Sequence, residues 1–186
     1  QRNYRTNIFG SLLTNTADFN VVIAPGFNDP DNNYEVLNAK GVSQLKDLLA
    51  SGADLSKKDV IVDLNGETMD SNIALNAHSV AVENGTVDAS QLIAKAEEGV
   101  TLRNVKLAGS FPKALSNARV IVETAGDVVV DGLDYTGATD GYNPLEINLK
   151  NVVSKNVTVK NCKFANFSNN AMSVFGMAEG GVLNIE

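Results

Sequence analysis

The chain lacks most of the residues from which disulfides and histidine or cysteine metal sites are built. Its 186 residues include one cysteine, Cys162, one histidine, His78, and no tryptophan. A single cysteine excludes an intrachain disulfide and a cysteine-rich zinc site, and a single histidine argues against a histidine-based metal centre. We therefore expect no metal site and no cofactor, and a fold that is stabilised by its hydrophobic core.

Long apolar runs and an excess of positive charge are absent as well. No apolar run approaches the roughly 18–20 residues that cross a bilayer, so we expect no direct membrane insertion of this segment. The formal net charge is -7, which argues against a nucleic-acid partner. Hydrophobic residues make up 44% and charged residues 20% of the chain, a balance typical of a globular fold.

What the chain does contain is a repeated segment. "VTLRNVKLAG" at 100–109, "VVVDGLDYTG" at 128–137 and "VTVKNCKFAN" at 157–166 share one pattern of apolar, charged and Asn or Gly positions. The first apolar residues of all such segments are Val60, Val80, Val100, Val128, Val157 and Leu183. A pattern that recurs at this spacing is typical of a repeat architecture.

Each position of the repeat predicts a structural role. The first and third positions are apolar between polar neighbours, which indicates a strand with one buried face. The fifth position is Asn84, Asn104, Gly132 or Asn161, residues that tolerate a left-handed backbone, so a bend is expected there. A second short strand follows the bend, with Cys162 as a small core residue. Further apolar runs precede the segments, at "NIALN", "QLIA", "ARVIVE", "PLEINL" and "AMSVFG".

Up to three short strands per repeat, separated by corners, predict an all-β fold, a right-handed single-stranded parallel β-helix. A β-sandwich would not keep the same apolar, charged and Asn or Gly positions aligned over five repeats. The domain is expected to span 36–186, with coils from about residue 60. Residues 41–52 read as an amphipathic helix that caps its N-terminal end. Residues 1–35 read as a β-hairpin and linker, the remnant of an upstream β-sandwich.

The fourth position of the repeat carries a column of charges that mostly alternate in sign. It reads Asp63, Glu83, Arg103, Asp131, Lys160, Glu186, and the seventh position reads Thr86, Lys106, Asp134, Lys163. Opposite charges on adjacent strands stabilise their pairing by about 0.2–1 kcal/mol each. These columns are therefore explained by stacking, without a ligand.

Catalytic chemistry would have to come from the strands that precede the main segments. Their expected outward side chains include Arg119, Glu123 and Glu146, together with the apolar Ile121 and Phe175. Two carboxylates could act in glycoside hydrolysis or lyase chemistry, but no third charge completes a site. We assign no catalytic residue and keep Arg119, Glu123 and Glu146 as candidates only if the protein is an enzyme. His78 has no Ser, Cys or acidic partner nearby in the pattern and is expected to be structural.

Binding function is expected in the corner loops and on exposed aromatic rings. Tyr135, Tyr142, Phe167 and Phe175 are the candidates for stacking against sugars. The acidic turn around Asp29 and Asp31 lacks the ligand spacing of a calcium loop, so we predict no metal site there.

With its repeats placed, the chain resembles the pectate-lyase-like right-handed parallel β-helix superfamily over about residues 41–186. "DVIVDLNGETM" resembles the first rung after a helical cap. The opening "YRTNIFGSLLTNTADFNVVIAPGFN" resembles the segment that links a fimbrillin-like domain to a β-helix in surface proteins of Bacteroides-type bacteria, which are described as adhesins of unknown ligand. The resemblance implies an exported protein on the outer cell surface, anchored through an upstream segment.

The expected function is therefore a non-catalytic cell-surface adhesion or glycan-binding module. Its expected partners are glycans or surface proteins, with end-to-end or upstream-domain contacts as a further possibility. A polysaccharide lyase or glycoside hydrolase acting in the β-helix groove is the alternative, and a structural spacer is the third reading, because this fold hosts all three.

Overall fold

A computed structural model describes residues 34–111, 118–139, 141–150 and 155–186. Residues 34–186 belong to one compact unit. The β-hairpin predicted for 1–35 therefore lies almost wholly outside the described residues. Within the described part the chain is mostly β, with a single helix and one parallel sheet of twelve strands.

The elements follow one another along the chain with short corners between them. In order they are β1 (Glu35–Lys40), α1 (Gly41–Ala50), β2 (Lys58–Asp63), β3 (Thr68–Met69), β4 (Ile73–Asp88), β5 (Leu92–Gly109), β6 (Ala118–Thr124), β7 (Asp127–Asp131), β8 (Asp134–Ala138), β9 (Asn143–Leu149), β10 (Asn156–Lys160), β11 (Met172–Phe175) and β12 (Val182–Ile185).

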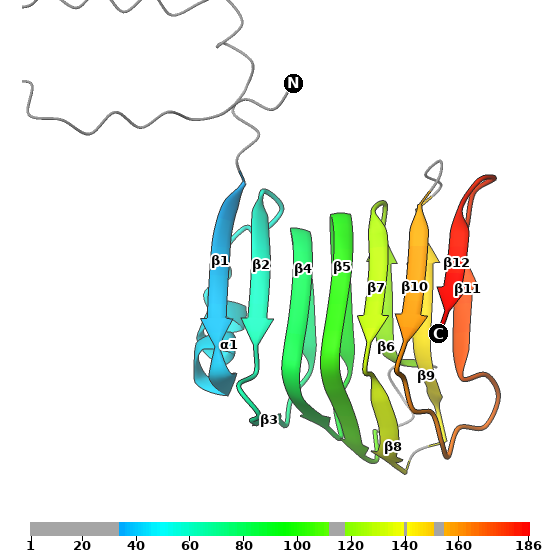
Figure 1. Ribbon diagram of the computed structural model, residues 1–186. Coiled ribbons are helices and arrows are strands. Elements are labelled where there is room, and N and C mark those ends of the chain that lie inside the picture. Colours follow the sequence, from blue (N-terminus) through cyan, green and yellow to red (C-terminus); the bar gives the residue numbers. More distant parts are fainter. Residues whose placement is uncertain (1–33, 112–117, 140, 151–154) are drawn as a thin grey trace, which may run out of the picture. The chain divides into compact units, whose positions relative to one another are not determined.

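The strands fall into three sets, which Figure 1 separates clearly. The front set contains β1, β2, the middle of β4, the middle of β5, β7, β10 and β12. The back set contains the starts of β4 and β5, then β6, β9 and β11. The lower set contains β3, the ends of β4 and β5, and β8. Every pairing among these described strands is parallel.

The register of the front set confirms the predicted repeat. Val60 pairs with Val80, and the same column continues through Val100, Val128, Val157 and Leu183. The valines of this column are at most 2% exposed. Successive segments of the sequence therefore stack in register and bury one shared core, whatever the length of chain between them.

The predicted bends are confirmed at the corner between the front and lower sets. Asn84, Asn104 and Asn161 adopt positive φ angles of 57°, 50° and 54°, and Gly132 adopts 75°. These are the left-handed conformations that Asn and Gly accept at the lowest energetic cost. The bend turns each strand from the front set toward the lower set.

Helix α1 confirms the helix expected within 41–52, and it ends at Ala50. Gly52 follows with φ 64°, the left-handed residue that commonly terminates a helix. Leu45 is fully buried, and Val42, Leu48 and Leu49 pack against the core. Figure 1 shows α1 behind β1, at the end of the sheet opposite β11 and β12.

Strand β1 was not anticipated, because coils were expected only from about residue 60. Glu35–Lys40 pairs in parallel with Lys58–Asp63, residue for residue. It carries only two inward residues, Leu37 and the buried Ala39. Its fifth position is Gly41, whose φ of 78° matches the bend of the later segments, but helix α1 follows where those segments have a second strand. The segment therefore matches only the first half of the repeat.

Candidate binding surfaces

Arg119, expected to point outward, is instead completely buried. Its Nε donates to the carbonyl of Ser90 at 2.9 Å, and its Nη2 donates to the carbonyl of Ala108 at 2.9 Å. Its guanidinium also lies 5.6 Å from the centre of the Phe111 ring, close enough for a cation–π contact. Arg119 therefore joins the corners of two neighbouring coils and is not available as a cationic group for a substrate.

Glu123 points outward as expected, but both of its carboxylate oxygens are bound by lysines. Lys95 Nζ lies 3.1 Å from Oε2, and Lys150 Nζ lies 2.6 Å from Oε1. Hydrogen bonds from Lys150 and Lys95 hold the pKa of Glu123 below its ordinary value. A general acid of a glycosidase needs a raised pKa, and a general base needs an oxygen open to water, so this carboxylate suits neither role.

Glu146 lies on the neighbouring strand of the back set, two residues out of register with Glu123. The pairing places Glu146 opposite Ile121, and Asn148 opposite Glu123. Asn148 Nδ2 donates to Glu146 Oε1 at 2.9 Å. From the strand spacing and the rise per residue, the two glutamate Cα atoms are about 8 Å apart. The two glutamates lie on neighbouring strands in one polar strip, in which lysines already neutralise the charge of Glu123.

Two of the four aromatic candidates are buried. Tyr135 is completely buried, and its hydroxyl donates to the carbonyl of Tyr142 at 3.2 Å. Tyr142 is also buried and packs edge-on against Phe111, with 6.0 Å between the ring centres. Neither ring offers a free face to a sugar, so Tyr135 and Tyr142 are corrected from binding candidates to core residues.

Phe167 and Phe175 are exposed and remain candidates for a binding surface. The exposed fraction is 36% for Phe167 and 55% for Phe175. Phe175 is the last residue of β11 and pairs with Asn148 on β9. It continues the outward column of the back set that contains Lys95, Glu123 and Asn148. An aromatic ring thus ends a strip of polar side chains.

His78 has the acidic partner that its sequence neighbours did not reveal. Its Nδ1 lies 2.8 Å from Asp59 Oδ1, and Ser79 Oγ donates to the same oxygen at 2.6 Å. Burial raises the pKa of Asp59, but the hydrogen bonds with Ser79 and His78 outweigh it and leave the pKa lowered. Tyr34 stacks on the His78 ring. Because Ser79 and His78 both bond to Asp59 rather than to each other, this is not a Ser–His–Asp catalytic relay.

The alignment of the repeats contains the signal that could have predicted the cluster of His78, Asp59 and Ser79. Asp59 directly precedes Val60, and Ser79 directly precedes Val80, so the two are paired in register. His78 sits at the corner one residue earlier. The repeat as aligned in the sequence began at Val60 and Val80. Had the alignment included the residue before each valine, it would have placed Asp59 beside Ser79, next to His78.

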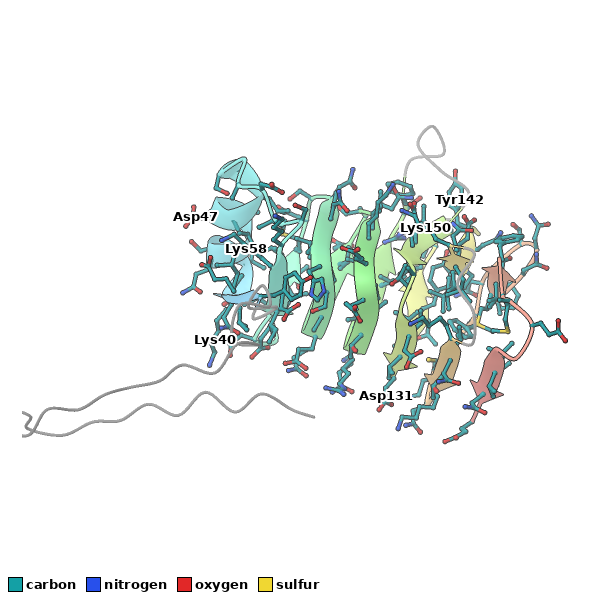
Figure 2. All side chains as sticks on the ribbon, turned by 90° about the horizontal axis from the view of Figure 1, so that it is seen from above. Lys40, Asp47, Lys58, Asp131, Tyr142 and Lys150 are labelled. Carbon is teal, nitrogen blue, oxygen red and sulfur yellow. The ribbon has the colours of Figure 1, made fainter. Side chains whose placement is uncertain are left out.

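Open grooves follow both edges of the front set. One groove, of about 430 Å³, lies over β2, β4, β5 and β7, where Ile61, Ala81 and Val129 border Asp59 and Asp127. Two further grooves of about 410 and 210 Å³ follow the asparagine corner and share Asn104 and Lys106. Figure 2 shows Asp131 on the front face and Lys150 and Tyr142 on the back side, so the corner grooves and the Glu123 strip are separate surfaces.

Cys162 is half-buried, as a small residue near the core. Its thiol donates to the carbonyl of Lys160 at 3.1 Å. Burial raises the pKa of this thiol, which disfavours the thiolate and so disfavours nucleophilic reactivity.

Among the described residues, no three His, Cys, Asp or Glu side chains group in a way that could hold a metal ion. No helix in this part of the chain is long and apolar enough to cross a membrane. Comparison with protein-family models, with curated proteins and with solved structures finds no match to the chain.

Proposed function

We propose that this chain is a non-catalytic adhesion or glycan-binding module displayed on the outer cell surface, with a saccharide bound along the back set near Phe175. The surface location follows from the resemblance of the opening segment to linkers in bacterial surface proteins. The binding role is argued from the side chains on the back set.

The observation that carries the proposal is the exposed ring of Phe175 beside a hydrogen-bonded amide and carboxylate. Sugars present apolar C–H faces and a rim of hydroxyl groups. A ring that is 55% exposed offers the stacking face, while Asn148 and Glu146, joined at 2.9 Å, offer donors and acceptors for hydroxyls. Ser173 pairs with Glu146 in the same strip and adds a hydroxyl.

Binding without turnover is favoured by the state of the charged groups nearby. Arg119 is buried, and both oxygens of Glu123 are bound by ammonium groups. A glycosidase needs one carboxyl group with a raised pKa and a second that can act on water or on the sugar. In this arrangement, Glu123 helps to hold the back set together.

The scaffold that we propose for this role is a right-handed single-stranded parallel β-helix. Its support is that β4 and β5 each pass through all three strand sets and pair with each other along most of their length. Connections between parallel strands are right-handed in about 98% of cases. A crystal structure of the chain tests this directly, and left-handed coils or an open sheet would contradict it.

A glycan array with the fluorescently labelled chain tests the binding proposal. Wild type should bind a subset of saccharides, and Phe175→Ala should weaken that binding by about 10- to 100-fold, because burying a phenylalanine ring contributes about 1.5–3 kcal/mol. Ile185→Ala is the matched control, since Ile185 is also a large exposed apolar side chain, on β12 of the front set. The Ile185→Ala variant should bind the same saccharides as strongly as wild type.

Three outcomes would count against the proposal. Equal loss in Phe175→Ala and Ile185→Ala would place the contact elsewhere, and no binding on a broad array would favour the spacer. Release of shortened saccharides by the wild-type chain, lost in Glu123→Gln, would show that it is an enzyme. Surface display is tested by labelling intact cells of the source organism with an antibody to this chain, and labelling only after lysis would refute it.

A further inference from the structure

Asn84, Asn104, Gly132 and Asn161 share the bend position and a positive φ, and of these four residues only Gly132 has no side chain. Each of the three asparagines donates a hydrogen bond to the preceding coil. Asn84 Nδ2 donates to Asp63 Oδ1 at 3.3 Å, and Asn104 Nδ2 donates to Asn84 Oδ1 at 3.2 Å. At Gly132 there is no side chain to continue this ladder, so the Oδ1 atom of Asn104 receives no hydrogen bond from the next coil.

The missing side chain opens a groove. A Cβ atom added to Gly132 would lie 2.9 Å from Asn104 Oδ1, so any side chain there would fill the space in front of that oxygen. The groove has a volume of about 410 Å³, within the range of about 300–1,000 Å³ that is usual for small-molecule sites. Its charged and amide lining consists of Asn104, Lys106, Asp131, Asp134, Asn161 and Lys163.

The acidic groups of the groove accept hydrogen bonds within the protein. Asp131 accepts a hydrogen bond from Asn161 Nδ2 at 2.8 Å and lies 3.6 Å from Lys160 Nζ. Asp134 accepts two hydrogen bonds from Thr136, at 2.9 Å from the backbone and 2.7 Å from the hydroxyl. These bonds fix the orientation of both carboxylates, and Lys160 partly offsets the charge of Asp131.

The two lysines of the groove are not paired in this way. Lys106 and Lys163 flank Asp134 on neighbouring coils, and both act on its carboxylate electrostatically. Within the described residues, however, neither makes an ion pair within 4.0 Å or a side-chain hydrogen bond. Both are exposed. The chain carries a net charge of -7, but charges farther than about 8 Å are largely screened at physiological salt. At the groove the local charges therefore matter most, and these are Lys106, Lys160 and Lys163 against Asp131 and Asp134.

The donors and acceptors match a particular ligand chemistry. Arginine forks suit planar carboxylates, whereas lysine ammonium groups act as point charges toward phosphate-like groups. A tetrahedral oxyanion has enough oxygens to accept from both lysines at once, and the open Asn104 Oδ1 can accept from a ligand hydroxyl. We propose that the groove at Gly132 binds the sulfate or phosphate ester of a hydroxyl-bearing ligand such as a sugar, at a site separate from Phe175.

Titration of the ¹⁵N-labelled chain, followed by NMR, tests this proposal with four probes: glucose 6-sulfate, glucose 6-phosphate, glucose and inorganic sulfate. The two esters should cause saturable shifts at the amides of Asn104, Gly132 and Asn161. Glucose and inorganic sulfate, which each supply only one half of the chemistry, should bind at least about 10-fold more weakly. The stronger of the two esters identifies the oxyanion.

Three variants separate the site from general electrostatics. Lys106→Gln with Lys163→Gln should weaken ester binding at least about 10-fold, while Lys40→Gln with Lys57→Gln, which changes the net charge equally at exposed positions, should leave it within about twofold. Gly132→Asn restores the residue that other coils carry at this bend and should abolish binding in a folded chain.

The proposal is overturned if neither ester produces saturable shifts, or if the shifts survive in the Lys106/Lys163 variant. It is also overturned if Gly132→Asn binds like wild type, or if inorganic sulfate binds as tightly as the esters. Phe175→Ala should retain ester binding, so loss of the site at Gly132 and loss of the site at Phe175 are distinguishable.

Discussion

At the scale of single residues, the corners of this protein depend on a large buried side chain, that of Arg119, and on a glycine, Gly126. Arg119 fills a corner and binds four main-chain carbonyls, those of Val87, Ser90, Ala108 and Gly109. Gly126 leaves a corner empty so that the neighbouring coil can approach. Both residues determine how closely adjacent coils stack.

Arg119→Met should strongly destabilise the chain. Methionine keeps an apolar stem of similar length but leaves the buried carbonyl of Ser90 without the Arg119 donor, which costs about 1–3 kcal/mol. It also removes the charged hydrogen bond to Ala108, whose carbonyl keeps the N–H of Ala89 as its donor, a bond worth about 1.5–3 kcal/mol. We expect a loss of about 3 kcal/mol or more in the free energy of unfolding, measured by urea titration. Lys57→Met, at an exposed position, should change it by less than about 0.5 kcal/mol. A similarly small effect of Arg119→Met would contradict the role assigned to Arg119.

Gly126→Ala should be comparably damaging, for a steric reason. The added Cβ would lie 1.4 Å from the carbonyl oxygen of Glu98, so the two coils would have to separate. Overpacking of this kind typically costs about 1–3 kcal/mol and sometimes more, which should appear as a lower Tm in circular dichroism. Gly66→Asn is the control, because nothing lies within 4 Å of its added Cβ and asparagine tolerates its positive φ. If both variants melt like wild type, the close approach at Gly126 is wrong.

At the scale of elements, cross-strand charges tie neighbouring coils together at the surface. Glu123 on β6 joins Lys95 on β5 to Lys150, which follows β9. On the front set, Lys160 on β10 lies 3.6 Å from Asp131 on β7. These side chains are partly exposed, so each pair should contribute little, but together they penalise a shifted register.

The Glu123 pairs predict a small acid dependence of stability. Because the folded-state pKa is below the ordinary value of 4.5, the contribution is fully present above that value and is lost as the pH falls through the lower folded-state value. Glu123→Gln should therefore flatten the acid limb of the stability profile, by less than about 1 kcal/mol for so exposed a network. Urea titrations between neutral pH and pH 3 measure this. A variant whose stability falls as steeply as that of wild type would exclude a contribution from Glu123.

The front-set ion pair can be isolated with a double-mutant cycle. Asp131→Asn, Lys160→Gln and the double variant should yield a coupling energy of about 0.2–1 kcal/mol in urea titrations. The same cycle on Asp63 and Lys160, which lie in one column but several coils apart, should give a coupling near zero. Equal coupling in the two cycles would mean that the charges act through the overall field and not through neighbouring strands.

The sequence could predict the structural role of a residue where residues of the same type recur at the same position of several repeats. Val80 and Val100 recur with the same neighbours, so the register of the front set and the left-handed bends were predictable. The period-two pattern predicted an outward Arg119, and this was wrong because the first three residues of β6 are all buried. The pairing of His78 with Asp59 depends on which residues become neighbours across coils, and a single occurrence of the motif does not reveal that.

At the scale of the whole described unit, stability should vary along the stack. In a repeat fold each coil is stabilised mainly by its neighbours. β5 pairs with β4 on one side and with β6, β7 and β8 on the other, whereas all four residues of β12 are exposed. Hydrogen exchange should therefore be slowest in β5 and fastest in β12. Uniform protection across both strands would instead indicate all-or-none unfolding of the unit.

The stacking has one consequence for how such a chain can change. Val100 pairs with Val128 across 28 positions as directly as Val80 pairs with Val100 across 20, so additional residues leave the register unaltered. The extra length falls mainly in the connection between β5, which ends at Gly109, and β6, which begins at Ala118. A connection between strands can thus lengthen while the paired columns keep their register, which makes the unit a scaffold whose connections can diversify independently of its core.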